Sequence, residues 1–281
     1  MLADSITEMI GAGVLAPAAI ALGVYWLASR LLPAAAASRD PIALALVSGF
    51  VVGYYLLHGS AAVVPSRHWH WLPWLGLAAG VTGCLAIHAG KVVWWLLMLA
   101  TCGAAAWFLV PTWASLEPPR VVWLIELAAI FCMLIGQTER LPSRSGGRLV
   151  VFLLGLTAAV MAATIAASVS LTYGQIAGLA ACALGGVWTG MWLTGRDDEL
   201  ATRAAVPAAL ILIGGIAFVG CIEPEPPNYG LLLLPGAPLG LSLCQIPALR
   251  GLTGRTATVV RICSVVVPLL AAAAVAYARV L

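Results

Sequence analysis

Charged residues are scarce in this sequence. Only 9% of its 281 residues are Asp, Glu, Lys or Arg, whereas a soluble globular domain carries about 25%. Hydrophobic residues make up 62% of the chain, and its mean hydropathy is +1.03. A chain of this length with so few polar groups lacks the polar surface that water requires. The composition therefore excludes a water-soluble globular protein and predicts an integral membrane protein surrounded by the lipid bilayer.

Motifs for several common chemistries are also missing. The chain has no H-E-x-x-H, no phosphate-binding G-x-x-x-x-G-K-[ST] and no G-x-S-x-G. Lys91 is the only lysine, and the arginines form no basic stripe of the kind that binds nucleic acid. The seven cysteines show no C-x-x-C spacing, which predicts small apolar side chains and not disulfides or zinc ligands. We therefore expect no enzyme, no cofactor, no metal and no nucleic-acid partner.

Apolar segments dominate what remains. A spanning α-helix needs about 20 predominantly apolar residues, and ten segments meet or approach that length. Asp4 and Glu8 precede the first one, where a cleaved secretory signal would carry positive charge. The sequence thus predicts an all-α polytopic transmembrane helix bundle that forms a single domain over 1–281. The predicted spans are 9–29, 41–58, 71–89, 92–110, 121–136, 149–171, 174–194, 204–221, 230–247 and 258–278.

The arginines predict the orientation of this bundle. Cationic residues gather in short cytoplasmic loops. With the N-terminus outside, 11 of the 14 cationic residues fall in inner loops, and only Arg67, Arg120 and Arg279 lie outside. This distribution predicts an N-out/C-out topology. Omitting either of the two weakest spans, 121–136 or 230–247, would move a loop with three arginines to the outside, so both are expected to cross.

Two further patterns concern the shape of the helices. Pro235 and Pro238 interrupt 230–247, which predicts a kinked or partly unwound segment, since proline removes a donor and clashes with the preceding turn. Tryptophans mark the interfaces: Trp69, Trp71 and Trp74 belong to the predicted outer belt, whereas Trp94 and Trp95 belong to the inner belt.

Small residues recur at helical spacing on three of the predicted helices. Such stripes let a neighbouring backbone approach closely, and the alternative is that they line a substrate path. The stripes comprise Gly76, Gly80, Gly83, Ala86 and Gly90; Ala45, Gly49 and Gly53; and Gly155, Ala159, Ala163 and Ala167.

A polar loop, 138–148, lies at the midpoint and leaves five helices on each side. Two halves, 1–137 and 149–281, would then have opposite topology, a plan that recurs in secondary transporters. The two halves show no sequence similarity, so this division rests on the helix count alone.

Glu126 is the strongest single candidate for a functional residue. An ionisable group at membrane depth is costly and is often retained for function. Glu126 lies five residues past Val121, which places it about 8 Å below the outer interface at 1.5 Å per residue. It is a candidate protonatable coupling site, and the alternative is a neutral or paired carboxyl group that stabilises helix packing.

Other polar residues gather in the predicted outer loops and helix ends. Histidine and carboxylate together suit a divalent metal, but H-x-H matches no specific metal motif. The alternative is that these groups are solvated loop residues and interfacial anchors. The candidates are His58, His68, His70, Glu223, Glu225 and, at the start of the seventh helix, Gln175.

Two stretches carry a resemblance. SLTYGQIAGLAACALGG, residues 170–186, and VPAALILIGGIAFVGCIEPEPP, residues 206–227, resemble a group of uncharacterised polytopic membrane proteins from bacteria with GC-rich genomes. The resemblance covers chiefly the C-terminal third and implies a bacterial inner (cytoplasmic) membrane location, without implying an activity.

Three functions are compatible with this sequence. A small-molecule or ion transporter is favoured by ten compact helices, the broken ninth helix, the glycine stripes and Glu126. A non-transporting scaffold or subunit of a larger membrane complex is favoured by the few charges at membrane depth. An intramembrane enzyme ranks last, because no paired catalytic groups are visible.

Overall fold

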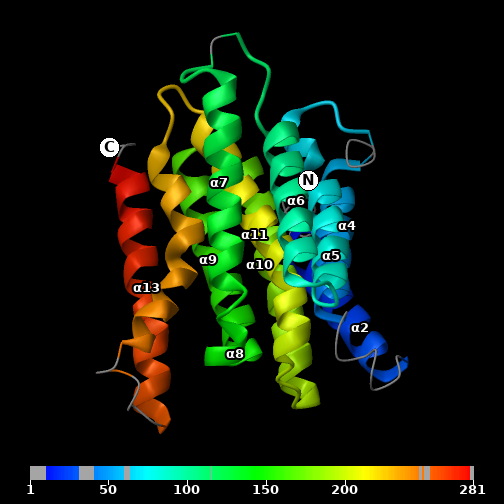
Figure 1. The fold of residues 1–281 in the computed structure, drawn as a ribbon. Coiled ribbons are helices and arrows are strands. Elements are labelled where there is room, and N and C mark those ends of the chain that lie inside the picture. The colour runs from blue at the N-terminus through cyan, green and yellow to red at the C-terminus, as the bar shows by residue number, and fades with distance from the viewer. Residues whose placement is uncertain are drawn as a thin grey trace.

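The computed structural model describes residues 11–31, 41–59, 64–114, 116–246, 249 and 254–278. Within these ranges the chain is helical and contains no strand, and its long helices lie side by side in one bundle (Figure 1). The predicted all-α helix bundle is confirmed. Its elements are η1 (Gly11–Leu15), α2 (Ala16–Leu31), α4 (Pro41–His58), η3 (His68–Trp71), α5 (Leu72–Ala86), α6 (Lys91–Leu109), α7 (Arg120–Thr138), α8 (Pro142–Ser145), α9 (Gly147–Ser168), α10 (Leu171–Thr194), α11 (Glu199–Ile222), η4 (Tyr229–Gln245) and α13 (Gly254–Ala278).

Within the described ranges, eight helices are long and apolar enough to cross a membrane, so the chain is a multi-pass membrane protein. They are α2 together with the end of η1, α4, α6, α7, α9, α10, α11 and α13. Two further segments of the predicted ten, α5 and η4, are shorter. α5 has 15 residues, or about 22 Å at 1.5 Å per residue.

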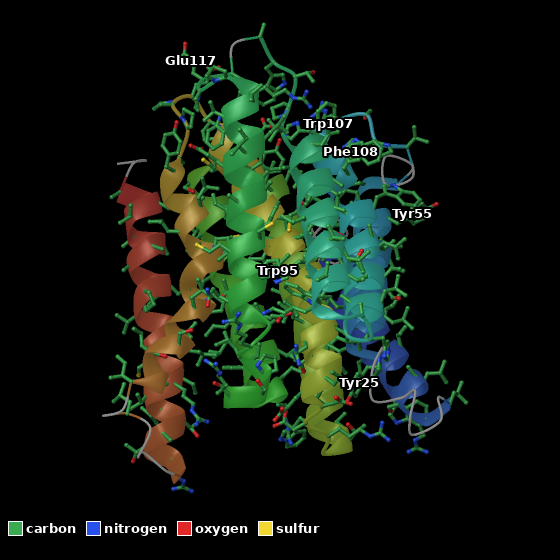
Figure 2. The ribbon with its side chains drawn as sticks, in the orientation of Figure 1. Tyr25, Tyr55, Trp95, Trp107, Phe108 and Glu117 are labelled. Atoms are coloured by element: carbon green, nitrogen blue, oxygen red, sulfur yellow. The ribbon has the colours of Figure 1, made fainter. Side chains whose placement is uncertain are left out.

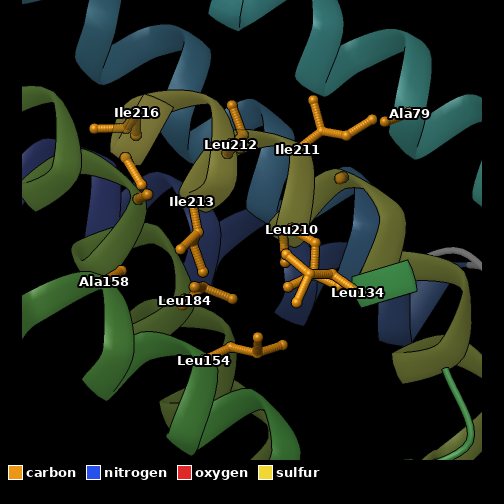
Figure 3. Close-up of a cluster of buried hydrophobic side chains, with 14 of the residues drawn as sticks. Ala79, Leu134, Leu154, Ala158, Leu184, Leu210, Ile211, Leu212, Ile213 and Ile216 are labelled. Carbon is orange, nitrogen blue, oxygen red and sulfur yellow. The ribbon is translucent and has the colours of Figure 1, made fainter. Parts of the chain in front are cut away.

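α11 is the central helix of the bundle. Every residue from Ala204 to Ile222 is buried, a degree of burial that no other spanning helix of the described ranges reaches. Helices α4, α5, α6, α7, α9, α10 and η4 pack against it. Side chains from α5, α9 and α10, such as Ala79, Ala158 and Leu184, belong to the same buried cluster (Figure 3). Because helices from both predicted halves surround α11, the halves interleave, and their division remains a prediction.

The glycine stripe of the third helix is a packing surface. A Cβ atom at Gly83 would overlap the carbonyl oxygen of Ala204 in α11, and one at Gly76 would lie 2.9 Å from a methyl carbon of Leu212. Gly90 does not belong to this surface, because it precedes α6 and has open space around it. The stripe of α4 packs similarly, since Gly49 and its neighbours contact α2.

The alanine ridge of α9 does not pack as predicted. Ala159, Ala163 and Ala167 are exposed on the outside of the bundle, whereas Gly155 faces α10. The prediction that all four form one packed ridge is wrong. Residues four apart drift around a helix of 3.6 residues per turn, so the ridge leaves the buried face.

η4 is a 3₁₀ helix of 17 residues that contains both Pro235 and Pro238. The predicted departure from a regular α-helix is confirmed. A 3₁₀ helix rises about 2.0 Å per residue, so 17 residues extend about 34 Å, which exceeds the ~30 Å hydrocarbon core. Leu231, Leu234 and Ala237 are buried at intervals of three, which matches three residues per turn. The longer rise per residue therefore makes η4 long enough for the hydrocarbon core although it has only 17 residues.

The bundle has two chemically different ends. We name the end that carries His58, His68, His70 and Glu223 the histidine end, and the opposite end, which carries α8 and Lys91, Arg140 and Arg203, the arginine end. α8 lies at one end of the bundle, and the last residues of α13 lie towards the other (Figure 1).

Candidate functional site

At the histidine end, the short helix η3 places two of the predicted histidines. The turn is closed by the N–H of His70, which donates to the carbonyl of Arg67 at 3.1 Å. The Nδ1 atom of His70 accepts the backbone N–H of Ser66 at 3.3 Å and lies 3.1 Å from the Ser66 hydroxyl. His70 is buried, so these contacts fix the ring, and burial together with Arg67 lowers the pKa of His70 below its usual value.

Trp69 is the centre of a buried aromatic cluster. Its ring centroid lies 4.0 Å from that of His70, 5.3 Å from His58 of α4 and 5.8 Å from Tyr173 of α10. Tyr54 completes the group at 6.2 Å. These separations are typical of edge-to-face packing between rings. Three elements that are distant in the sequence are thus joined at one point, and Trp69, only 6% exposed, is a core residue as well as an interfacial one.

His68 points away from that cluster, towards the end of α11. Its Nε2 atom lies 3.5 Å from Oε1 of Glu223, and its ring meets Trp113 edge to face at 5.4 Å. Burial, reinforced by His70 and Arg67, lowers the pKa of His68 to about 4. His68 is therefore neutral at pH 7, and its contact with Glu223 joins a neutral imidazole to a carboxylate. Tyr173 lies near the same carboxylate.

A cleft of about 550 Å³ opens beside His68 and Glu223. It has the size of a small-molecule site. Its lining is mostly polar and charged, with aromatic side chains among the polar groups. Trp107 and Phe108 lie on the half of α6 nearest this end (Figure 2). We name it the histidine-end cleft. Its lining is Ser66, Arg67, His68, Trp107, Phe108, Val110, Pro111, Thr112, Trp113, Arg120 and Glu223.

Two arginines give this cleft its charge. Arg67 is exposed at the rim. Arg120 is held in place, because its guanidinium group donates to the carbonyl oxygens of Trp107 at 3.2 Å and Val110 at 3.4 Å. The same group lies 4.7 Å from the ring of Trp107, within the range of a cation–π contact. With His68 neutral, the two guanidinium groups outweigh the single carboxylate of Glu223.

The structure thus brings together four of the seven candidates: His58, His68, His70 and Glu223. Two of the others lie outside the cleft. Glu225 is exposed in the loop after α11, and Gln175 is half-buried in α10. Among the described residues, no three His, Cys, Asp or Glu side chains gather closely enough to hold a metal ion, so the His68–Glu223 contact is a pair.

Glu126 lies apart from the site. Its side chain is exposed on the outer face of α7, and it does not line the cleft. α7 extends beyond its neighbours at the histidine end (Figure 1), and it is 19 residues long, or about 28 Å. Glu126 lies in the second turn of α7, in the half nearest that end. An outward side chain disfavours pairing of Glu126 within the bundle, and its coupling role stays a prediction.

Sequence reasoning gave Arg67 and Arg120 no role in a site. A signal for the two arginines was present: they break the positive-inside pattern, since they fall outside while the loops inside hold most of the cations. Arg67 and Arg120 lie on the predicted outer side, against the positive-inside bias, and both line the histidine-end cleft.

No protein-family model, no curated protein and no solved structure matches this chain. The resemblance of residues 170–186 and 206–227 to bacterial membrane proteins stays a prediction. The function must therefore be argued from the chain's own residues.

Proposed function

We propose that the protein is a small-molecule transporter that takes up a small organic anion with an aromatic or apolar body through the histidine-end cleft. The observation that carries this proposal is the pair Arg67 and Arg120 in a mostly polar cleft, which also contains three aromatic side chains, at the end of a membrane bundle. Guanidinium groups bind carboxylate, sulfonate and phosphate oxygens with charge-assisted hydrogen bonds. Trp107, Phe108 and Trp113 offer apolar surface to the rest of the ligand.

The charge of the cleft favours an anion over a cation. Glu223 is the single carboxylate in its lining, and it is already in contact with His68 at 3.5 Å. Arg120 is fixed by two carbonyl groups, so it presents its charge without a large loss of side-chain entropy on binding. Arg67, at the rim, is available to close over a bound ligand.

The conformation described is closed below the cleft. α11 carries only apolar residues, glycine and one cysteine between Arg203 and Glu223, and this stretch is buried throughout. Transport therefore requires a second conformation. η4 is the element best suited to change, because it packs on α11 and α13 with 3₁₀ geometry, which is less favourable than α-helical geometry over long runs.

Uptake into proteoliposomes tests this proposal. A permanently charged probe such as benzenesulfonate does not cross lipid as a neutral acid, so its accumulation reports on the protein. We expect saturable uptake that Arg67→Gln reduces about tenfold or more, since one charge-assisted contact is lost. Arg196→Gln is the matched control, because Arg196 is an exposed arginine at the other end of the bundle. Uptake that is unaffected by Arg67→Gln, or absent for every organic anion tested, would contradict the proposal.

A second candidate function is a non-transporting scaffold or subunit of a membrane complex. The exposed alanine ridge of α9 favours it, because Ala159, Ala163 and Ala167 form a smooth outer surface that suits a neighbouring helix. Purification in mild detergent tests this alternative. A stoichiometric protein partner would support it, whereas a lone chain that takes up benzenesulfonate would exclude it.

The location is part of the same proposal. The distribution of arginines favours a histidine end outside and an arginine end in the cytoplasm, and the resemblance to bacterial proteins supports an inner-membrane location. Labelling of a cysteine introduced at Arg67, but not at Arg144, by a membrane-impermeant reagent on intact cells is the expected outcome.

A further inference from the structure

A second cavity, of about 290 Å³, lies at the arginine end. Four segments form it: the turn between α5 and α6, the start of α6, the end of α7 and the first turn of α11. Its lining includes the side chains of Lys91, Trp94, Trp95, Glu139, Arg140 and Arg203. We name it the arginine-end cavity, and it is separated from the histidine-end cleft by the length of α11.

Cations outnumber acids in this cavity by three to one. The single carboxylate, Glu139, lies 3.7 Å from Nη2 of Arg203, so one cation is matched. Lys91 and Arg140 add two further positive charges beside that pair. An anion that enters the cavity therefore meets a local excess of positive charge.

One donor in the cavity wall lacks an acceptor. The Nε atom of Arg203 is buried and has no hydrogen-bond partner among the described residues, although the rest of the side chain is 40% exposed. A buried donor without a partner costs free energy, typically about 1–3 kcal/mol. Phosphate suits a guanidinium group in the cavity wall, because its several oxygen atoms match the planar fork of that group.

The aromatic residues place the cavity at the membrane surface. Trp94 and Trp95 lie in the first turn of α6, with ring centroids 4.6 Å apart, and Trp95 is 37% exposed. Trp95 lies on the half of α6 opposite Trp107 (Figure 2). Tryptophan is enriched at the depth of lipid headgroups. The cavity is therefore lined on one side by residues that face lipid and on the other by residues that bind anions.

We propose that the arginine-end cavity binds a phosphate group, and that the headgroup of an anionic phospholipid in the adjacent leaflet supplies it. Basic pockets between helices on the cytoplasmic side of membrane proteins bind such headgroups. The volume of about 290 Å³ accommodates a headgroup while the acyl chains remain in the bilayer. This site is independent of the histidine-end cleft and of the anion proposed there.

Native mass spectrometry of the protein in neutral detergent tests this inference. The protein is titrated separately with phosphatidylglycerol, with zwitterionic phosphatidylcholine and with inorganic phosphate. We expect phosphatidylglycerol to bind at one site and phosphatidylcholine to bind about tenfold more weakly or not at all. Retention of inorganic phosphate with no preference for phosphatidylglycerol would keep the phosphate site and assign it to a soluble ligand.

Variants with opposite expected effects separate binding from folding. The double change Lys91→Gln and Arg140→Gln leaves the Arg203–Glu139 pair in place, and it should weaken phosphatidylglycerol binding about tenfold or more. Glu139→Gln removes the competing carboxylate, so it should strengthen binding. Arg255→Gln is the matched control, because Arg255 is exposed on α13 and does not line the cavity. Equal binding of the two lipids without phosphate retention, or equal binding by all variants, would overturn the proposal.

Discussion

The two ends of α11 carry cavities that both combine arginine with tryptophan, but they hold their arginines differently. At the histidine end, Arg120 donates to two carbonyl groups and packs on Trp107. At the arginine end, Arg203 has one contact with Glu139 at 3.7 Å and a buried Nε atom without a partner among the described residues. The first arrangement is pre-organised, whereas the second is incomplete.

The surroundings differ in the same way. The histidine end is consolidated by rings from three elements around Trp69, and burial keeps His68 neutral. The arginine-end cavity has the exposed cations Lys91 and Arg140 beside the one carboxylate in its lining, Glu139. We infer that the histidine end contributes more to the stability of the fold, while the arginine end is more easily adjusted by what binds there.

The largest expected effect comes from the close contact between α5 and α11. Gly83→Val should prevent correct packing of α5 on α11, because the added side chain would overlap the carbonyl of Ala204, at a cost of at least about 3 kcal/mol. We expect loss of monodisperse protein in size-exclusion chromatography. Gly103→Val is the matched control, since Gly103 also lies in a helix and has open space around it. A well-folded Gly83→Val protein would refute this close packing.

The next effect compares the loss of a buried tryptophan at the histidine end with the loss of an exposed tryptophan at the arginine end. Trp69→Ala should lower the free energy of unfolding by about 3–5 kcal/mol, as for other buried large aromatic residues. Trp95→Ala should cost less than about 1 kcal/mol, because Trp95 is 37% exposed, against 6% for Trp69. Thermal unfolding in detergent measures both. Similar losses for the two variants would remove the proposed difference in stability between the ends.

Acid should weaken the histidine end selectively. The folded protein keeps His68 neutral down to a pKa of about 4, whereas the unfolded chain takes up that proton near pH 6.5. The free energy of unfolding should therefore fall as the pH decreases from about 6.5 to 4, by on the order of 3 kcal/mol. Melting temperatures of the wild type and of His68→Gln across this range measure it. The wild type should lose more stability than the variant, and parallel curves would contradict the prediction.

The smallest effect tests the start of α11 at the arginine end. Oδ1 of Asp198 accepts the backbone N–H groups of Leu200 and Ala201 at 3.1 and 3.0 Å, which caps the helix. Asp198→Ala should cost about 1 kcal/mol. Glu199→Ala is the comparison, because Glu199 is exposed in the same turn. If the two variants melt at the same temperature, the cap contributes little to stability.

Much of the architecture was predictable from local sequence. Apolar runs between short polar loops fix where helices form, because lipid offers the backbone no hydrogen bonds. The spacing of Gly76, Gly80 and Gly83 predicted a close helix contact. Pro235 and Pro238 predicted an irregular ninth segment, although its winding as a 3₁₀ helix over Tyr229–Gln245 depends on packing against α11 and α13.

The candidate site was only half predictable. The local sequence identified His58, His68, His70 and Glu223 as polar groups at one end, but it also favoured Glu126. Which side of α7 faces the bundle depends on how the helix is rotated, and a helix that is apolar on nearly all sides carries little information about rotation. The exposure of Glu126 and of the α9 alanines follows from that ambiguity.

The sequence by itself determined that this protein is a multi-pass helical membrane protein, because its composition and apolar run lengths leave lipid as the only suitable solvent. Only the tertiary structure decided which residues meet. Arg67 and Arg120 are 53 residues apart, and Glu223 is more distant still, yet all three line one cleft. Side-chain packing around α11 creates that proximity, and packing between distant segments is a property of the assembled bundle.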